Sequence, residues 1–147
     1  MPLGYQDVHL EIHSTIDALD LVQAVTEHIA RHLGFDDEAL HWTAMAVRES
    51  VVNAITHANA SDPEKRVFID YSVSYEPDPP DFIVTVRDQG PGFDPDTLKN
   101  PLTPENMLNT SGRGIFLIRQ FMDDVSMRRA PQGGMEVRMT KHIRPTE

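Results

Sequence analysis

The order of hydrophobic patterns along the chain limits its fold more than any other feature. Apolar residues recur at helical spacing in two consecutive stretches, about residues 15–33 and 37–59. Strand-like alternation marks five other segments, at about residues 6–13, 67–75, 82–88, 124–129 and 135–142. Because few strands are separated by single helices, the order argues against a doubly wound parallel sheet. It predicts an α+β, two-layer α/β sandwich, with a mixed, mostly antiparallel sheet and helices on one face.

Local signals predict where both long helices begin and end. Ser14 or Thr15 is expected to cap the first helix, and Gly34 to end it. Asp36 or Asp37 is expected to cap the second helix.

A long connection and a third helix are predicted before the last two strands. Residues 94–111 are rich in Pro, Asn and Thr and are expected to form a loop, with room for a short helix. Loops this long in a compact domain are often functional lids. The third helix is predicted from Gly112 to about Met122.

Composition and charge narrow the class of protein. A chain of 147 residues fits one domain, which we expect to span residues 1–147. Acidic residues outnumber basic ones by 23 to 13, and this net charge of −10 argues against a nucleic-acid surface. It suits a basic protein partner, although it can also serve solubility alone. The absence of cysteine excludes disulfides and a thiol nucleophile and suits a cytoplasmic location. No apolar run approaches the ~20 residues that span a bilayer, so no membrane association is expected.

The second helix carries three polar residues on one side. Glu49, Asn53 and His57 are spaced four residues apart, next to the apolar stripe. An Asn carbonyl oxygen is a suitable ligand for Mg²⁺, and Glu49 could accept a proton near a bound phosphate. His57 could pack under the neighbouring strand. The alternative is that these residues form only the polar flank of an amphipathic helix.

A carboxylate and two glycines follow the third predicted strand. Alternation places Asp88 on the same side as three apolar residues, so its carboxylate faces the core and needs a donor. The amino group of adenine would be such a donor. Gly90 and Gly92 follow at once and allow a ligand to approach the backbone. An ordinary Asp-Gly turn is the alternative explanation.

A second glycine pair opens the third helix. Gly112 and Gly114 would leave N–H groups free to bind phosphate, and Arg113 could add a charged fork. An ordinary loop-to-helix junction with a surface arginine explains the same residues. No Gly-x-x-x-x-Gly-Lys-Ser/Thr sequence is present, which excludes a Walker-type site.

Taken together, the three segments resemble the ATP-binding domain of the GHKL superfamily, whose architecture is the Bergerat fold. Residues 49–57 resemble its N-box, and residues 88–93 resemble its first glycine box, Asp-x-Gly-x-Gly-Phe. Residues 112–114 resemble the second glycine box. The resemblance spans about residues 8–141 and is greatest to the anti-sigma-factor serine/threonine protein kinases, which consist of little more than the ATP domain.

This resemblance implies a histidine-kinase-like ATP-binding domain with ATP and Mg²⁺ as cofactors. It also implies two protein partners, an anti-sigma factor antagonist with a target Ser or Thr and a sigma factor or similar regulator, together with a homodimer. The implied roles of residues follow the three boxes: Glu49 for the acceptor hydroxyl, Asn53 for Mg²⁺, Asp88 for the adenine amino group, Gly90, Gly92 and Phe93 for the adenine pocket and lid, and Gly112, Arg113 and Gly114 for the phosphates.

One position departs from the family pattern. Met135 follows the Gly133-Gly134 turn, where the family usually has a threonine that helps to hold adenine. The side chain of Met135 is expected to face the core beside Val137 and Met139. Three functions therefore remain: an active kinase, a partner-binding module of the same fold that binds nucleotide weakly, or an ATPase without a protein substrate.

Overall fold

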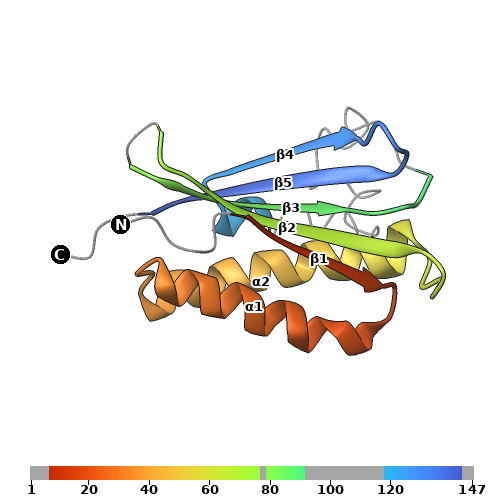
Figure 1. Cartoon of the computed structure of the whole chain (residues 1–147), viewed down its shortest axis with the longest axis horizontal. Coiled ribbons are helices and arrows are strands. Elements are labelled where there is room, and N and C mark those ends of the chain that lie inside the picture. Colours follow the sequence, from red (N-terminus) through yellow and green to blue (C-terminus); the bar gives the residue numbers. More distant parts are fainter. Residues whose placement is uncertain (1–6, 77–78, 92–117, 144–147) are drawn as a thin grey trace.

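The computed structural model describes residues 7–76, 79–91 and 118–143. Within these ranges five strands form an antiparallel sheet in the order β1-β2-β3-β5-β4. Figure 1 shows this sheet above two long helices. The strands are β1 (Asp7–His13), β2 (Arg66–Ser74), β3 (Asp81–Arg87), β4 (Asp124–Arg129) and β5 (Met135–His142). Each predicted strand is present, with bounds within one residue of the prediction.

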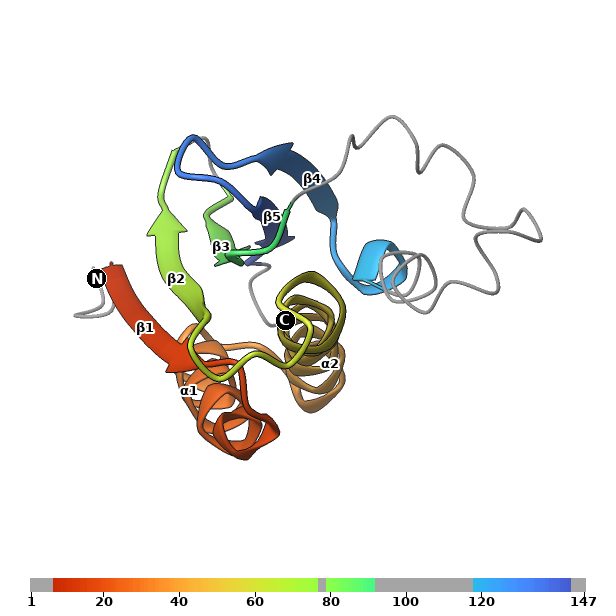
Figure 2. The ribbon, with the colours of Figure 1, turned by 90° about the vertical axis from the view of Figure 1, so that its right-hand side faces the viewer.

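Both long helices cover the same face of the sheet, as the end-on view shows (Figure 2). They are α1 (Leu19–His32) and α2 (Asp37–Asn53). This arrangement of a sheet on one layer of helices confirms the predicted two-layer α+β fold.

The core lies between the two layers. Alternate residues of β2 and β3 face the helices and are fully buried, among them Ile69, Tyr71 and Val84. Burial of an aliphatic side chain of this size contributes about 1.5–3 kcal/mol. The Tyr71 hydroxyl is satisfied inside the core by Thr26 Oγ1 of α1, 2.8 Å away. The apolar residues that alternate along the strands therefore pack against those that recur at helical spacing, and together they form the core.

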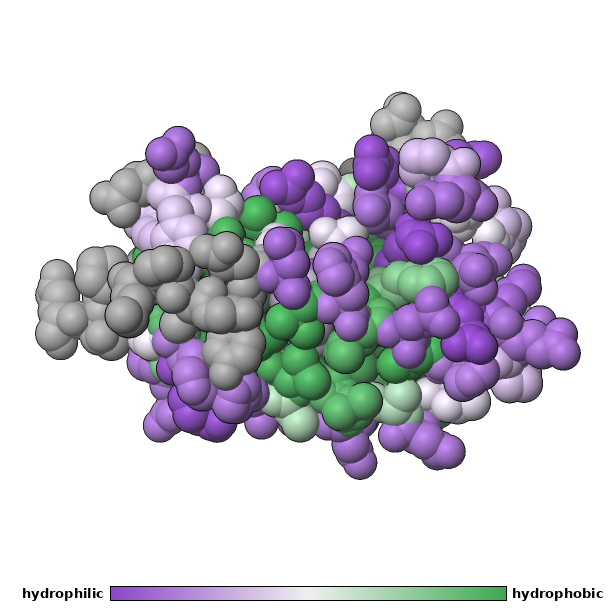
Figure 3. Space-filling model, viewed as in Figure 1, coloured by the Kyte–Doolittle hydropathy of each residue, from purple (hydrophilic) through white to green (hydrophobic). Residues whose placement is uncertain are grey.

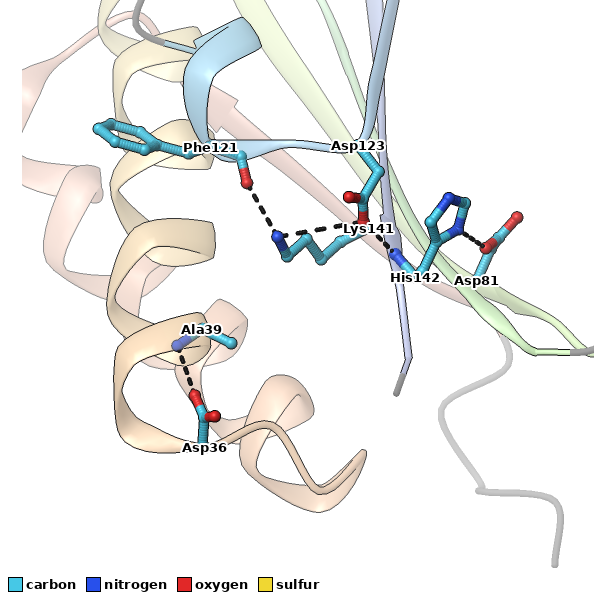
Figure 4. Close-up of polar contacts among 7 residues, drawn as sticks. All are labelled: Asp36, Ala39, Asp81, Phe121, Asp123, Lys141 and His142. Carbon is cyan, nitrogen blue, oxygen red and sulfur yellow. Dashed lines mark hydrogen bonds and ion pairs between the residues drawn. The ribbon is translucent and has the colours of Figure 1, made fainter. Parts of the chain in front are cut away.

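The predicted end of α1 and start of α2 are both present. Gly34 follows α1 with a φ of +86°, a conformation that glycine adopts without steric cost. The Asp36 side chain accepts a hydrogen bond from the Ala39 N–H at 2.7 Å, which caps α2 (Figure 4).

The predicted cap of the first helix was wrong. A short 3₁₀ turn, η1 (Ile16–Ala18), precedes α1, and Thr15 makes no capping hydrogen bond with its side chain. The Ser14 hydroxyl instead donates to the Lys65 carbonyl oxygen at 2.8 Å. Ser14 therefore bonds to the residue that precedes β2 instead of capping the helix.

The second helix ends close to its predicted end at about residue 59, but its last turn is not α-helical. After Asn53 the backbone widens into a π-helical turn, η2 (Ala54–Ala58). The Asn59 N–H donates to the Ala54 carbonyl oxygen at 2.9 Å, which closes this wider turn. Such π turns are rare and occur often at functional sites.

The end of the third predicted helix is described for residues 118–121 only. Lys141 Nζ of β5 donates to the carbonyl oxygen of Phe121 at 3.1 Å, so a cation lies at the helix C-terminus (Figure 4). The Phe121 ring stacks on Trp42 of α2, with centroids 4.4 Å apart. These two contacts hold the last helix against both layers. No helix within the described residues is long and apolar enough to cross a membrane.

Candidate functional site

The site residues that the structure describes lie at one end of the sandwich. The end of α2, the end of β3 and the start of β5 are all at the right-hand side of Figure 1. Glu49 and Asn53 come from the helix, and Asp88 and Gly90 follow β3. The fold thus brings together the first and second of the three sequence segments.

Asn53 is the last residue of α2 and has an unusual side chain. Its Nδ2 is buried and makes no hydrogen bond to any of the residues that the structure describes. Buried amides are normally paired, so an unpaired one at a helix end is a position where a ligand group could bind. Glu49 lies one helical turn earlier and is half-buried. His57 is exposed in η2, so the expectation that it packs under a strand was wrong.

Asp88 occupies the core side of the sheet, as the alternation predicts. It is only 6% exposed, and burial raises the pKa of its carboxyl above the ordinary 3.8. The N–H groups of Met135 and Gly90 both donate to Oδ1, each at 3.0 Å, and work against that rise in pKa. Since both bonds use Oδ1, none of the described residues donates to Oδ2, which can accept a hydrogen bond from a ligand.

Two glycines allow the backbone to close around Asp88. A β-carbon at Gly90 would lie 2.2 Å from the carbonyl oxygen of Ala58, so the turn after β3 packs directly on η2. A β-carbon at Gly134 would lie 2.1 Å from the Asp88 carbonyl oxygen and 2.8 Å from its Oδ1. Sequence reasoning identified Gly90 as a site residue but missed Gly134, although its position before Met135 was a signal.

Met135 is buried as predicted, 2% exposed, and its backbone contacts the site. Its N–H donates to the Asp88 carboxylate, and its carbonyl oxygen accepts from the Asp88 N–H at 3.0 Å. The departure from threonine therefore removes a hydroxyl but leaves the backbone contacts that orient Asp88.

Sequence reasoning also missed Asn59. Its side chain is fully buried and contacts Ser14, Arg66 and the N–H of Gln89 in the turn after Asp88. A polar residue directly after an Ala-rich helical stretch was the available signal.

Five predicted site residues lie outside the described residues: Gly92, Phe93, Gly112, Arg113 and Gly114. Their implied contacts with the lid and the phosphates stay predictions.

The described residues fit a nucleotide better than a metal ion alone. They contain no group of three or more His, Asp or Glu side chains that could hold a metal. Within the described part of the chain, Asn53 Nδ2 is unpaired and Asp88 Oδ2 accepts no hydrogen bond, which suits a ligand that brings its own polar groups. A Mg²⁺ bound at Asn53 would take its other ligands from water and phosphate.

A separate hollow lies on the sheet face opposite the helices. It has a volume of about 480 Å³ and contains none of the predicted site residues. Its lining is Ser72, Ile83, Thr85, Ser126, Arg128, Glu136 and Arg138.

Comparison with known proteins identifies the family. Residues 12–141 match the family model described as the histidine kinase-like ATPase domain. The match covers most of the chain, and the chain belongs to this family, as the resemblance of the three segments implied.

Curated relatives and a solved structure agree with this assignment. The chain is 32% identical over 141 residues to the anti-sigma F factor of Bacillus subtilis (strain 168), covering 93% of this chain and 92% of that one. It is 29% identical over 149 residues to the serine-protein kinase RsbW of Listeria innocua, covering 97% and 91%. The crystal structure of the RsbU and RsbW domains of a Mycobacterium tuberculosis protein has the same fold, with a TM-score of 0.66 and 18% identity. That match covers 95% of this chain and 33% of the larger one.

Proposed function

We propose that this chain is an ATP-dependent protein serine/threonine kinase that acts as an anti-sigma regulatory factor. It would phosphorylate an anti-sigma factor antagonist and bind a sigma factor or similar regulator, in the cytoplasm, with residues 1–147 as one ATP-binding domain. The observation that carries this proposal is the buried Asp88 carboxylate, which keeps one oxygen available at the same end of the fold as Asn53 and Glu49. The names of the curated relatives support the regulatory role.

The described residues suit three separate tasks in phosphoryl transfer. Asp88 Oδ2 would accept a hydrogen bond from the amino group of adenine and so select adenine over other nucleobases. The carboxamide of Asn53 would hold Mg²⁺ through its oxygen. Glu49, one turn away on the same side of α2, would orient or deprotonate the acceptor hydroxyl.

ATP with Mg²⁺ supplies the phosphoryl group and neutralises its charge, a reaction that depends mainly on positioning and electrostatics. A weak carboxylate base therefore suffices at Glu49. The chain would hold adenine at Asp88 and Mg²⁺ at Asn53, and would leave Glu49 facing the protein substrate.

Transfer of labelled phosphate from Mg-ATP to a cognate antagonist tests the proposal. Glu49→Gln keeps the shape of the side chain but removes the base, and we expect about a 10²–10⁴-fold slower transfer with ATP affinity retained. Glu64→Gln, at an exposed turn, is the matched control and should transfer normally. Full transfer by Glu49→Gln would rule out the assigned role of Glu49.

A weakly nucleotide-binding partner-switching module is the second candidate. Met135 favours it, because its buried side chain cannot supply the hydroxyl that the family usually has at this position. Calorimetry with ATP and Mg²⁺ separates the two functions. Binding that is absent, or that is unchanged by Asn53→Ala and Asp88→Asn, would support the module.

We also propose that the chain forms a homodimer through β1 and α1. Among the described strands β1 is at one edge of the sheet and pairs only with β2. Figure 3 shows apolar side chains gathered over β1 and α1 on this face. Leu10 of β1 is only partly buried and Leu21 of α1 is 55% exposed. Apolar surface of this kind often marks a protein–protein contact.

A further inference from the structure

The side chain of Asn59 lies at the end of the β2–β3 ladder, next to the turn that follows Asp88. Phe68 pairs with Arg87, so two residues further along the same register Arg66 is opposite Gln89. The Asn59 side chain bridges this pair: Nδ2 donates to the Arg66 carbonyl oxygen at 3.0 Å, and Oδ1 accepts from the Gln89 N–H at 2.8 Å. The carboxamide thus takes the place of a direct bond between the two strands.

The partners determine which way the carboxamide points. A carbonyl oxygen can only accept and a backbone N–H can only donate, so the Arg66 and Gln89 contacts fit one orientation. The second hydrogen of Nδ2 is donated to Ser14 Oγ at 2.8 Å. The Ser14 hydroxyl in turn donates to the Lys65 carbonyl oxygen. Asn59 is fully buried, so its removal would leave backbone groups unpaired inside the protein.

These contacts connect the two halves of the candidate site. The Asn59 N–H closes the π turn that begins directly after Asn53. Its Oδ1 holds Gln89, the residue between Asp88 and Gly90. Gln89 is also tied to the sheet, because its Oε1 accepts from the Arg66 N–H at 2.7 Å. A displacement of Asn59 would therefore shift the Asp88 turn relative to the end of α2.

We propose that Asn59 is a positioning residue that places the Asp88 carboxylate relative to Asn53 and so determines the preference of the site for adenine. The inference rests on the proposed ATP-binding function. Asn59 acts through Gln89 and the π turn, and needs no contact with nucleotide.

Nucleotide selectivity tests the proposal. Asn59→Ala, which removes a buried carboxamide, is compared with Thr26→Val in α1, which removes a fully buried hydroxyl with bonds of 2.8 Å to Val22 and Tyr71. We expect Asn59→Ala to weaken Mg-ATP binding by about tenfold, equivalent to about 1.4 kcal/mol, with a much smaller change for Mg-GTP. Thr26→Val should lower Tm while leaving the ATP-to-GTP ratio unchanged.

Two further variants make the result specific to the bridge. Ser14→Ala keeps the Arg66 and Gln89 contacts of Asn59 and should retain the ATP-to-GTP ratio. If Asn59→Ala does not fold, Asn59→Ser replaces it, because a serine hydroxyl is too short to bridge Arg66 and Gln89. An unchanged ratio in the folded Asn59 variant would overturn the proposal.

Hydrogen exchange gives a readout that needs no nucleotide. The N–H groups of Gly90 and Met135 donate to Asp88 Oδ1, so their protection reports the placement of that carboxylate. In the Asn59 variant their protection should fall by more than the global loss of stability, and in Thr26→Val by no more than that loss. If the unchanged protein binds neither nucleotide, the proposed function fails, while the exchange data still decide the role of Asn59. A uniform loss of protection across the sheet would contradict it.

Discussion

The Asp88 carboxyl group is kept in a place that costs folding free energy. Burial raises its pKa above 3.8, and two backbone N–H groups offset only part of that rise. Between 3.8 and the raised value the folded protein holds a proton that the unfolded chain has released. This contribution to stability is therefore present in acid and is lost as the pH rises through that interval. A charged group retained at such a cost is typical of a binding site.

Asp88→Asn should stabilise the protein without nucleotide at neutral pH and abolish ATP binding. An amide oxygen can still accept from Met135 and Gly90 but carries no charge to bury. We expect Tm to rise by a few degrees, since about 1 kcal/mol shifts Tm of a domain this size by about 2–4 °C. The gain should disappear in acid, which thermal melts across the pH range would show.

A surface carboxylate at the other end of the sheet provides the control for this experiment. Asp124→Asn changes an exposed residue of β4 and should leave both the pH dependence and ATP binding unaltered. A lower Tm for Asp88→Asn at neutral pH would mean that its hydrogen bonds outweigh the burial of charge.

Gly90→Ala should displace the turn after β3, because the new methyl group would meet the Ala58 carbonyl oxygen. We expect a loss of about 1–3 kcal/mol and weaker ATP binding, measured by chemical unfolding and calorimetry. Gly34→Ala is the matched control, since it is strained by a φ of +86° but has open space around it. It should lose about 1–2 kcal/mol of stability with ATP affinity intact. Equal ATP affinity in both variants would contradict the proposed packing role of Gly90.

At the scale of elements, the last helix is held by two contacts of different kinds. Stacking of Phe121 on Trp42 joins it to α2, and Lys141 joins its C-terminus to β5. Lys141 also lies 4.0 Å from Asp123, whose carboxylate accepts from the His142 N–H (Figure 4). This helix follows the second glycine segment in the sequence, so its position matters for the predicted phosphate contacts.

Trp42 should report nucleotide binding, since it is the sole tryptophan of the chain and stacks on this helix. We expect its fluorescence to change on addition of Mg-ATP, and Phe121→Leu to remove most of that change. The same variant should lose about 0.5–1.5 kcal/mol of stability with the aromatic pair. Phe68→Leu is the control, because Phe68 contacts Arg87 and belongs to β2, away from Trp42. An identical fluorescence change in the unchanged protein, Phe121→Leu and Phe68→Leu would show that the contact between Phe121 and Trp42 does not respond to nucleotide.

At the scale of the whole molecule, the described sheet has two edge strands, β1 and β4, and apolar surface is exposed over β1 and α1 (Figure 3). The acidic balance of the chain gives long-range attraction to a basic partner, whereas the apolar area over β1 and α1 suits close contact. The two features can therefore serve different partners.

Leu21→Glu should weaken the proposed homodimer, because it would bury a charge where the β1 and α1 surfaces of the two chains meet. We expect the mass from light scattering to fall toward that of one chain at concentrations where the unchanged protein is a dimer. Tyr75→Glu changes an exposed aromatic residue just beyond β2 and should leave the mass unchanged. A single-chain mass for the unchanged protein would exclude the dimer.

The sequence by itself determined the five strands, the two long helices and the layer architecture, because apolar periodicity and glycine or aspartate boundaries act locally. The alternation that ends at Asp88 also placed this carboxylate on the core side. Tertiary structure decided what those residues contact. Ser14 bonds to the Lys65 carbonyl oxygen instead of capping the helix, and the Asn59 amide lies between Arg66 and Gln89. Such bonds join residues far apart in the chain, and only the packed fold brings their donors and acceptors within reach.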